Sequence, residues 1–252
     1  MRMDRFLGTM GPLFALAALG ALSGCNGLWP GLGDGDGVPL AKLDLDAGPP
    51  QGVALAGPDT VSITTGERFT VAVEGEAADK LRFKLENGTL GIMRDQNSWF
   101  ANGGNGSATV HITMPAPRRL STAGSGHMTS DSLASEAELS IAGSGVLETP
   151  AVETASLKVS IAGSGAYLAG GHTDKLDLSI TGSGKGDMAG LKARHASISI
   201  AGSGDAIFAS DGEIEANIMG SGTVTVRGSA RCKVTAVGSG SLICERAAEA
   251  AT

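Results

Sequence analysis

Apolar and polar residues alternate in short runs that recur along the second half of the chain. In one run Leu157, Val159 and Ile161 occupy every second position, with the polar residues Lys158 and Ser160 between them. A period of two is typical of a β-strand that buries one face. The same pattern returns in the following segments: Leu176, Leu178 and Ile180; Ala196, Ile198 and Ile200; Ile214, Ala216 and Ile218.

A Gly-Ser-Gly triplet closes each run and sets the length of the repeat. Successive triplets are 19, 20, 19, 20, 18 and 18 residues apart. The alternation resumes two and four residues beyond the triplet, most clearly at Val224 and Val226. A nearly constant period of this size indicates stacked units, each consisting of strand, tight corner and strand. The first glycines of the triplets are Gly124, Gly143, Gly163, Gly182, Gly202, Gly220 and Gly238.

The predicted fold is therefore all-β, a parallel β-helix with about 18–20 residues per coil. Leucine-rich repeats would need a Leu/Asn framework and a helical half, and neither is visible in the sequence. Hairpins would be antiparallel and need not repeat at one length. Seven corners stacked at ~4.8 Å per coil predict a rod segment on the order of 30 Å long.

The triplets are interpreted as structural corners. Glycine reaches positive φ where the chain turns sharply, and it lets corners stack without clashes between Cβ atoms. A phosphate-binding loop would need a lysine and a helix after its glycines, and a nucleophilic serine would need one special copy with His and Asp partners. The corner serines are instead expected to form a hydroxyl ladder able to bond between coils. They are Ser125, Ser144, Ser164, Ser183, Ser203, Ser221 and Ser239.

Residues 53–118 keep the two-residue alternation without the triplet, as in the run Phe69, Val71 and Val73. We expect strands that continue the same sheets and cap the first coil, because a bare terminal coil would offer unpaired backbone to other chains. Residues 93–107 are predicted to form the one long loop. Its Trp99 and Phe100 are interpreted as capping hydrophobes, with ligand contact as the alternative.

The N-terminal segment has the features of an export signal. Two arginines precede an uncharged apolar stretch of 17 residues, short of the ~20 that span a membrane as a helix. The stretch ends in Leu22-Ser-Gly-Cys25, which resembles a bacterial lipobox and implies that residues 1–24 are removed and that Cys25 is acylated. An ordinary signal peptide containing a cysteine is the alternative. The absence of Asp at position 26 favours the outer membrane, and residues 25–52, rich in Gly and Pro, are expected to form a tether.

Three stretches of the chain together resemble one known family. They are GPDTVSITTGERFTVAVEG, LENGTLGI and VHITMPAPRRLSTAGSG, followed by repeated IAGSG coils. The order is similar to that of the GIN-domain family, also called the auto-transporter adhesin head domain, over about residues 53–245. Pro117 is a minor departure from the aliphatic residues usual there. The resemblance implies a β-helical bacterial envelope protein, and it supplies no catalytic residues.

Composition and cysteines add two expectations. Removal of residues 1–24 would change the formal net charge of −7 to −8. The remaining chain has no basic block, so nucleic acid is not expected as a partner.

Cys232 and Cys244 fall on inward positions of the last coil, and an exported protein permits disulfides, so a Cys232–Cys244 bond is predicted. Two buried free thiols are the alternative.

No catalytic residue, cofactor site or metal site is predicted. The four histidines share no metal-ligand spacing, and the pairs Glu136/Glu138 and Glu213/Glu215 would lie on the solvent face of strands. The predicted function is that of a non-catalytic envelope lipoprotein that adheres to, or binds, a glycan or protein. A self-assembling scaffold is the alternative, and a polysaccharide-acting enzyme is a third. The oligomeric state is left open, and residues 246–252 are expected to be a polar tail.

Overall fold

The computed structural model describes residues 37–45, 48–95 and 106–245. The predicted leader, Cys25, residues 26–36 and 46–47 of the tether, Trp99, Phe100 and the tail after Glu245 lie outside these ranges. The described chain is built from strands, with two short 3₁₀ turns, η2 (Leu40–Lys42) and η3 (Ala78–Lys80). The strands are β1 (Gly52–Ala56), β2 (Thr60–Thr65), β3 (Thr70–Glu74), β4 (Leu81–Glu86), β5 (Thr89–Arg94), β6 (Thr109–Met114), β7 (Arg119–Gly124), β8 (His127–Ser130), β9 (Glu136–Gly143), β10 (Val146–Gly163), β11 (Ala166–Gly182), β12 (Lys185–Gly202), β13 (Asp205–Ala209), β14 (Glu213–Gly220), β15 (Thr223–Arg227), β16 (Arg231–Gly238) and β17 (Ser241–Glu245).

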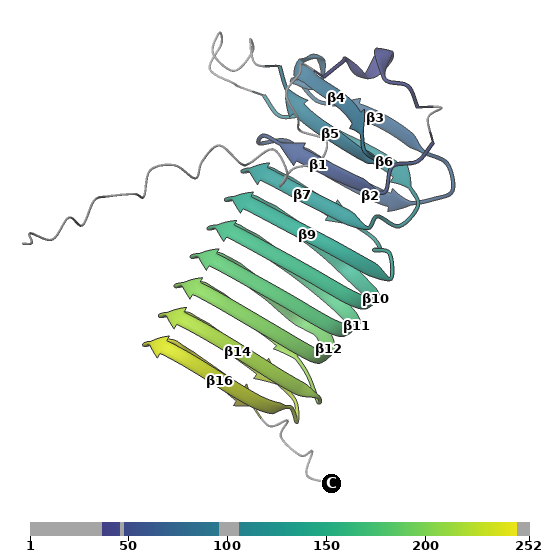
Figure 1. Ribbon diagram of the computed structural model, residues 1–252. Helices are drawn as coiled ribbons and strands as arrows, with labels where there is room; N and C mark the ends of the chain where they lie inside the picture. Colours follow the sequence, from purple (N-terminus) through teal and green to yellow (C-terminus); the bar gives the residue numbers. More distant parts are fainter. Residues whose placement is uncertain (1–36, 46–47, 96–105, 246–252) are drawn as a thin grey trace, which may run out of the picture.

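The predicted parallel β-helix is confirmed, with about seven coils. Strands β7, β9, β10, β11, β12, β14 and β16 lie side by side as successive rungs of one face (Figure 1). All of these pairings are parallel, and the corner glycines pair with one another from coil to coil, as in Gly143 with Gly163 and Gly163 with Gly182. The repeat length in the sequence is therefore the length of one coil.

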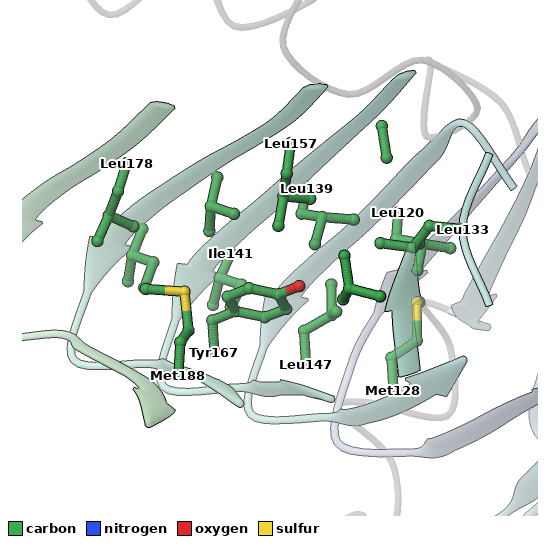
Figure 2. Packing of buried hydrophobic residues seen from close by; sticks show 14 of the residues in the cluster. Leu120, Met128, Leu133, Leu139, Ile141, Leu147, Leu157, Tyr167, Leu178 and Met188 are labelled. Carbon is green, nitrogen blue, oxygen red and sulfur yellow. The ribbon is translucent and has the colours of Figure 1, made fainter. Parts of the chain in front are cut away.

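The inward positions of neighbouring coils form columns of aliphatic side chains. One column contains Leu139, Val159 and Leu178, which are paired in register and buried. Figure 2 shows side chains from the two sheets meeting in the interior of the coils. Tyr167 is fully buried there and its hydroxyl lies 2.6 Å from the Thr149 hydroxyl, so the polar atom has a partner. Burial raises the pKa of the Tyr167 phenol well above its ordinary value.

Each of the three middle coils has a third, short side that the repeat pattern did not predict. Strands β10, β11 and β12 run 17 or 18 residues from one corner to the next. Their middle segments turn further residues inward, among them Val152, Thr173 and Leu191, which are buried. The pairings shift register near the start of these segments, as between Thr149 and Val152, which marks a bend in the strand.

The two ends of the rod differ. At one end β3 pairs antiparallel with β6, and β4 pairs antiparallel with β5, so the predicted strand cap is present (Figure 1). At the other end β16 pairs with β14 and β17 pairs with β15, each along one edge. The described residues place no strand beyond β16 and β17, and this coil is consequently less buried than those before it.

The corners are held together by backbone atoms. The first glycine of each triplet has φ between +106° and +128°, a region that residues with a Cβ rarely occupy. Amide N–H groups donate to the glycine carbonyls of the preceding corner, for example Ser164 N to Gly143 O at 2.9 Å. Within residues 106–245 no corner serine hydroxyl bonds to another, so the expected hydroxyl ladder gives way to a ladder of amides.

A disulfide joins Cys232 on β16 to Cys244 on β17, twelve residues apart. Cys232 pairs in register with the buried Ile214, and Cys244 pairs with the buried Val226. Both cysteines therefore occupy inward columns, but Cys244 is exposed because no described coil covers it. The bond closes the last coil across its interior.

Candidate binding face

The outward side of the strands that end at the glycine corners carries an uncharged strip. Over five coils the position three residues before the glycine is always serine, and the position one residue before it is alanine in four coils and threonine in one. We call these residues the serine–alanine stripe. The register aligns each member with its counterparts on the neighbouring coils. The stripe consists of Ser121 and Ala123, Ser140 and Ala142, Ser160 and Ala162, Ser179 and Thr181, and Ser199 and Ala201.

Beside the stripe, the first half of the same strands carries charged residues of both signs, which we call the charged ladder. Salt bridges run between neighbouring coils because residues of opposite charge are aligned by the register. The ion pairs are Arg118 with Glu136 at 2.8 Å, Lys158 with Glu138 at 3.0 Å, Arg231 with Glu213 at 2.9 Å and Lys233 with Glu215 at 3.0 Å. Exposed pairs of this kind each contribute ~0–1 kcal/mol, so their main effect is to neutralise the ladder locally.

The ladder contains the two carboxylate pairs that the sequence singled out. Glu136, Glu138, Glu213 and Glu215 lie on the solvent face as expected, and each is bonded to a base on an adjacent coil. Catalysis by paired carboxylates needs two acids that face one substrate with separated protonation states. Here each acid faces its own cation.

A shallow depression of about 440 Å³ lies at the start of the last strands of this face. Lys175, His195, Glu213 and Arg231 line it with other residues of the charged ladder. Three of its lining residues are basic and two are acidic, and the two acids, Glu213 and Glu215, are paired with Arg231 and Lys233. The part of the chain that the structure describes contains no group of three or more His, Cys, Asp or Glu able to hold a metal ion.

A buried ion pair near the capped end was not visible in the sequence. The Arg94 Nε donates to Asp59 Oδ2 at 2.8 Å, and an Arg94 terminal nitrogen donates to Asp59 Oδ1 at 2.6 Å. Asp59 also accepts from the Ala108 amide, and Arg94 donates to the Gly106 carbonyl. The hydrogen bond to the Asp59 carboxylate raises the pKa of the Arg94 guanidinium. The pair thus fixes the chain on both sides of residues 96–105.

Within residues 37–45, 48–95 and 106–245 no helix has the length and apolarity needed to cross a membrane. The described histidines are also dispersed over the surface. His111 lies beside Glu74, His127 beside Thr129 and His172 beside Asp174. These neighbours come from different coils and strands and form no common centre.

Comparison with known families matches residues 49–230 to the model described as "Putative auto-transporter adhesin, head GIN domain". The chain belongs to this family. The resemblance drawn from the three sequence stretches is therefore confirmed, and the GIN domain accounts for most of the described residues. No curated protein matches the sequence.

Solved structures share the fold of this GIN domain. A protein from Bacteroides fragilis, titled a "putative adhesin", is 19% identical with a TM-score of 0.69, covering 78% of this chain and 92% of its own. A "putative lipid binding protein" from Parabacteroides distasonis is 22% identical with a TM-score of 0.62, covering 78% and 93%. A "putative adhesin" from Parabacteroides merdae is 15% identical with a TM-score of 0.59, covering 78% and 92%. At these identities the likeness establishes the architecture.

Proposed function

We propose that this GIN-domain protein is a non-catalytic adhesin of the bacterial cell envelope that binds an extended glycan along the serine–alanine stripe. The observation that carries the proposal is the register of the stripe, which repeats a serine hydroxyl on five successive coils and an alanine methyl on four of them. The adhesin names given to members of the family and to structural neighbours support the same general role.

The chemistry of the stripe suits a carbohydrate polymer. Serine hydroxyls both donate and accept hydrogen bonds, as sugar hydroxyls do. Ser179 and Ser199 are exposed, and the small residues beside them, Thr181 and Ala201, leave the surface flat enough for a sugar ring to approach closely. Rungs in a parallel sheet repeat every ~4.8 Å, a spacing close to the length of one sugar unit in an extended chain. A polymer lying across several coils would repeat the same weak contact, which raises its affinity through multivalency.

The uncharged stripe and the neutralised ladder also bear on the kind of glycan. A strongly anionic polymer would be expected to meet unpaired basic residues, whereas the ladder's bases already have carboxylate partners. We therefore propose a neutral polysaccharide as the ligand class.

The proposed location rests on the leader and the lipobox. In this proposal residues 1–24 are removed, Cys25 is acylated, and the segment between Cys25 and Gly37 holds the domain off the outer membrane. The later part of the expected tether belongs to the folded domain, since Val38 pairs with Phe83 and Leu40 packs against the core. Replacement Cys25→Ser tests the anchor, and the protein is expected to leave the detergent-extracted membrane fraction. If the variant remains in that fraction, the anchor proposal is wrong.

The binding proposal is tested with the full chain in mild detergent on an array of neutral and charged polysaccharides. Ser179→Arg places a long charged side chain in the middle of the stripe and is expected to weaken binding at least about tenfold, equivalent to 1.4 kcal/mol. Ala166→Arg is the matched control. Ala166 is an outward residue at the start of the same strand β11, on a different side of the coil from the stripe, so this variant is expected to bind like the unmodified protein. Equal binding by Ser179→Arg and the unmodified protein would refute the stripe as the site.

A further inference from the structure

The last coil leaves both its backbone and its interior without cover. Strand β16 pairs only with β14 along its length, and β17 pairs only with β15, among the strands that the structure describes. Val234 occupies the inward column that contains the buried Ala216, yet 47% of its surface is exposed. An edge of this kind presents a row of free N–H and C=O groups that another strand can pair with.

Exposed apolar side chains are concentrated at this end of the rod. Five large hydrophobic residues are exposed in the described ranges, and all but Val38 lie on the last two coils. Val237 is 68% exposed on the outward side of β16, and Ile243 is 46% exposed on the outward side of β17, so exposed apolar side chains flank the uncovered coil. Exposed large apolar side chains gathered at one end of a folded domain are a feature of interaction sites.

We propose that a second copy of this chain covers the terminal coil, so that two rods join through their uncapped ends in a two-fold symmetric dimer. The capped end argues against head-to-tail stacking, because β3 and β4 close it with antiparallel strands that leave no bare parallel coil to receive β16. The matching surface for an uncapped coil is another uncapped coil. A two-fold interface uses the same patch on both molecules, and such an assembly stops at two.

The side chains of β16 are compatible with this pairing. When β16 of each copy pairs antiparallel about Val234, inward residues of one copy meet inward residues of the other, and Cys232 lies opposite Ala236. On the outward side Lys233 lies opposite Thr235 and Arg231 lies opposite Val237. No like charges face each other, and the aliphatic part of Arg231 can cover the exposed Val237 of the second copy. Arg231 and Lys233 also keep their own partners, Glu213 and Glu215.

Residues 246–252 are the competing occupant. Their sequence is Arg-Ala-Ala-Glu-Ala-Ala-Thr, which contains no apolar side chain larger than alanine. Alanine and glutamate are depleted in strands, so this segment is poorly suited to extend the sheet or to fill the interior beside Val234. A second copy supplies both the valines and the strand edge.

The experiment is sedimentation of the full chain in mild detergent over a wide concentration range. The unmodified protein is expected at the mass of a dimer. Val234→Lys places an ammonium group at the centre of the interface and is expected to give half that mass. Met219→Lys is the matched control, since this apolar residue is 60% exposed, more than Val234, but lies on β14 and not on the edge strand, and the variant is expected to remain dimeric. Thermal melting of all three proteins verifies that the variants fold.

Three results would overturn the inference. One is a monomeric unmodified protein at every concentration, and another is a Val234→Lys variant that stays dimeric. The third is an unmodified monomer that becomes dimeric on deletion of residues 246–252, which would assign the terminal coil to the chain's own tail. Glycan binding is measured separately, and Val234→Lys is expected to retain it per molecule, so the dimer and the proposed adhesin function can fail independently.

Discussion

Substitution Gly163→Ala tests whether the corners stack as closely as the structure indicates. Gly163 has φ of +118°, and a Cβ added there would lie 2.5 Å from the carbonyl oxygen of Gly143 on the preceding coil. Both the backbone conformation and the available space therefore exclude a side chain. The obstructing atom belongs to the backbone of a paired strand, so it cannot move aside without breaking the ladder.

The expected loss of stability has two parts. A left-handed conformation costs a residue with a Cβ about 1–2 kcal/mol. Forcing an extra carbon into a closely packed site costs about 1–3 kcal/mol. Replacement of glycine also restricts the unfolded chain, which offsets about 0.4–1 kcal/mol. We expect Gly163→Ala to lower the free energy of unfolding by ~2–4 kcal/mol.

Two further alanine variants separate the cost of the left-handed conformation from the cost of the steric clash. Gly88 in the turn between β4 and β5 has φ of +69° and open space around its Cβ position, so Gly88→Ala reports conformational strain alone, about 1 kcal/mol. Gly165 lacks a left-handed φ, but its Cβ would lie 2.5 Å from the Ile141 Cγ2 methyl and 2.7 Å from Gly145 O, so Gly165→Ala reports the steric cost without the conformational one.

The assay is urea denaturation followed by far-UV circular dichroism, with the slope of the transition compared among variants. Gly163→Ala is expected to be the most destabilised of the three. If it proves no worse than Gly88→Ala, the corner carbonyls are not in close contact and the stacking argument fails.

Three other perturbations concern the disulfide, the buried ion pair and an ionised residue, Asp211, in the turn between β13 and β14. Joint replacement of Cys232 and Cys244 by serine is expected to lower the free energy of unfolding by ~3 kcal/mol, measured by urea denaturation, because the disulfide restricts the unfolded chain. Asp59→Asn is expected to cost ~3–5 kcal/mol, measured the same way, since it leaves the Arg94 charge buried without its carboxylate. A third prediction concerns the pKa of Asp211, which is lowered from 3.8 to about 2 by the hydrogen bond to Lys192 and then by bonds from Ser229. Because this pKa is lower in the folded chain, the stabilisation is complete above the ordinary carboxyl pKa and is lost as pH falls through about 2, and Lys192→Gln is expected to raise the midpoint of the Asp211 NMR titration.

A different result would contradict each of these three predictions. Unchanged unfolding of the double serine variant would mean that the last coil needs no covalent closure. For the ion pair, the double variant Asp59→Leu with Arg94→Met removes both charges and is expected to be milder than Asp59→Asn alone, and an additive loss would contradict the argument from buried charge. If the midpoint of the Asp211 titration is the same in Lys192→Gln as in the unmodified protein, Lys192 is not the main cause of the lowered pKa.

The coil and its corners could be predicted from the sequence because both depend on local, repeated patterns. Strand periodicity at Leu157, Val159 and Ile161 and the fixed distance between glycines define one coil without reference to distant residues. The third side of the middle coils could not be predicted. Its inward positions, such as Val152 and Leu191, are too few to show the two-residue alternation of a strand. A register shift precedes them, and bends of this kind leave no regular signature.

The candidate binding face and the buried ion pair depend on contacts between residues that only the fold brings together. Serines at one position of each run were visible as polar residues, but their alignment into a stripe required the register between coils. Asp59 and Arg94 are 35 residues apart and belong to no repeat, so no sequence pattern joins them. We expected serine hydroxyls to connect the corners, whereas the structure connects them through backbone amides. A sequence displays its side chains but not its backbone hydrogen bonds, so it could not indicate this.

The equivalence of the coils has a consequence for how such a protein can change. Because each coil begins and ends at the same backbone geometry, duplication or deletion of one 18–20-residue unit in the gene would lengthen or shorten the rod by one rung while the remaining rungs keep their inward and outward assignments. If the proposed function holds, the length of the rod and the number of contacts with a long polysaccharide would then change together, in whole steps, without any change to an individual coil.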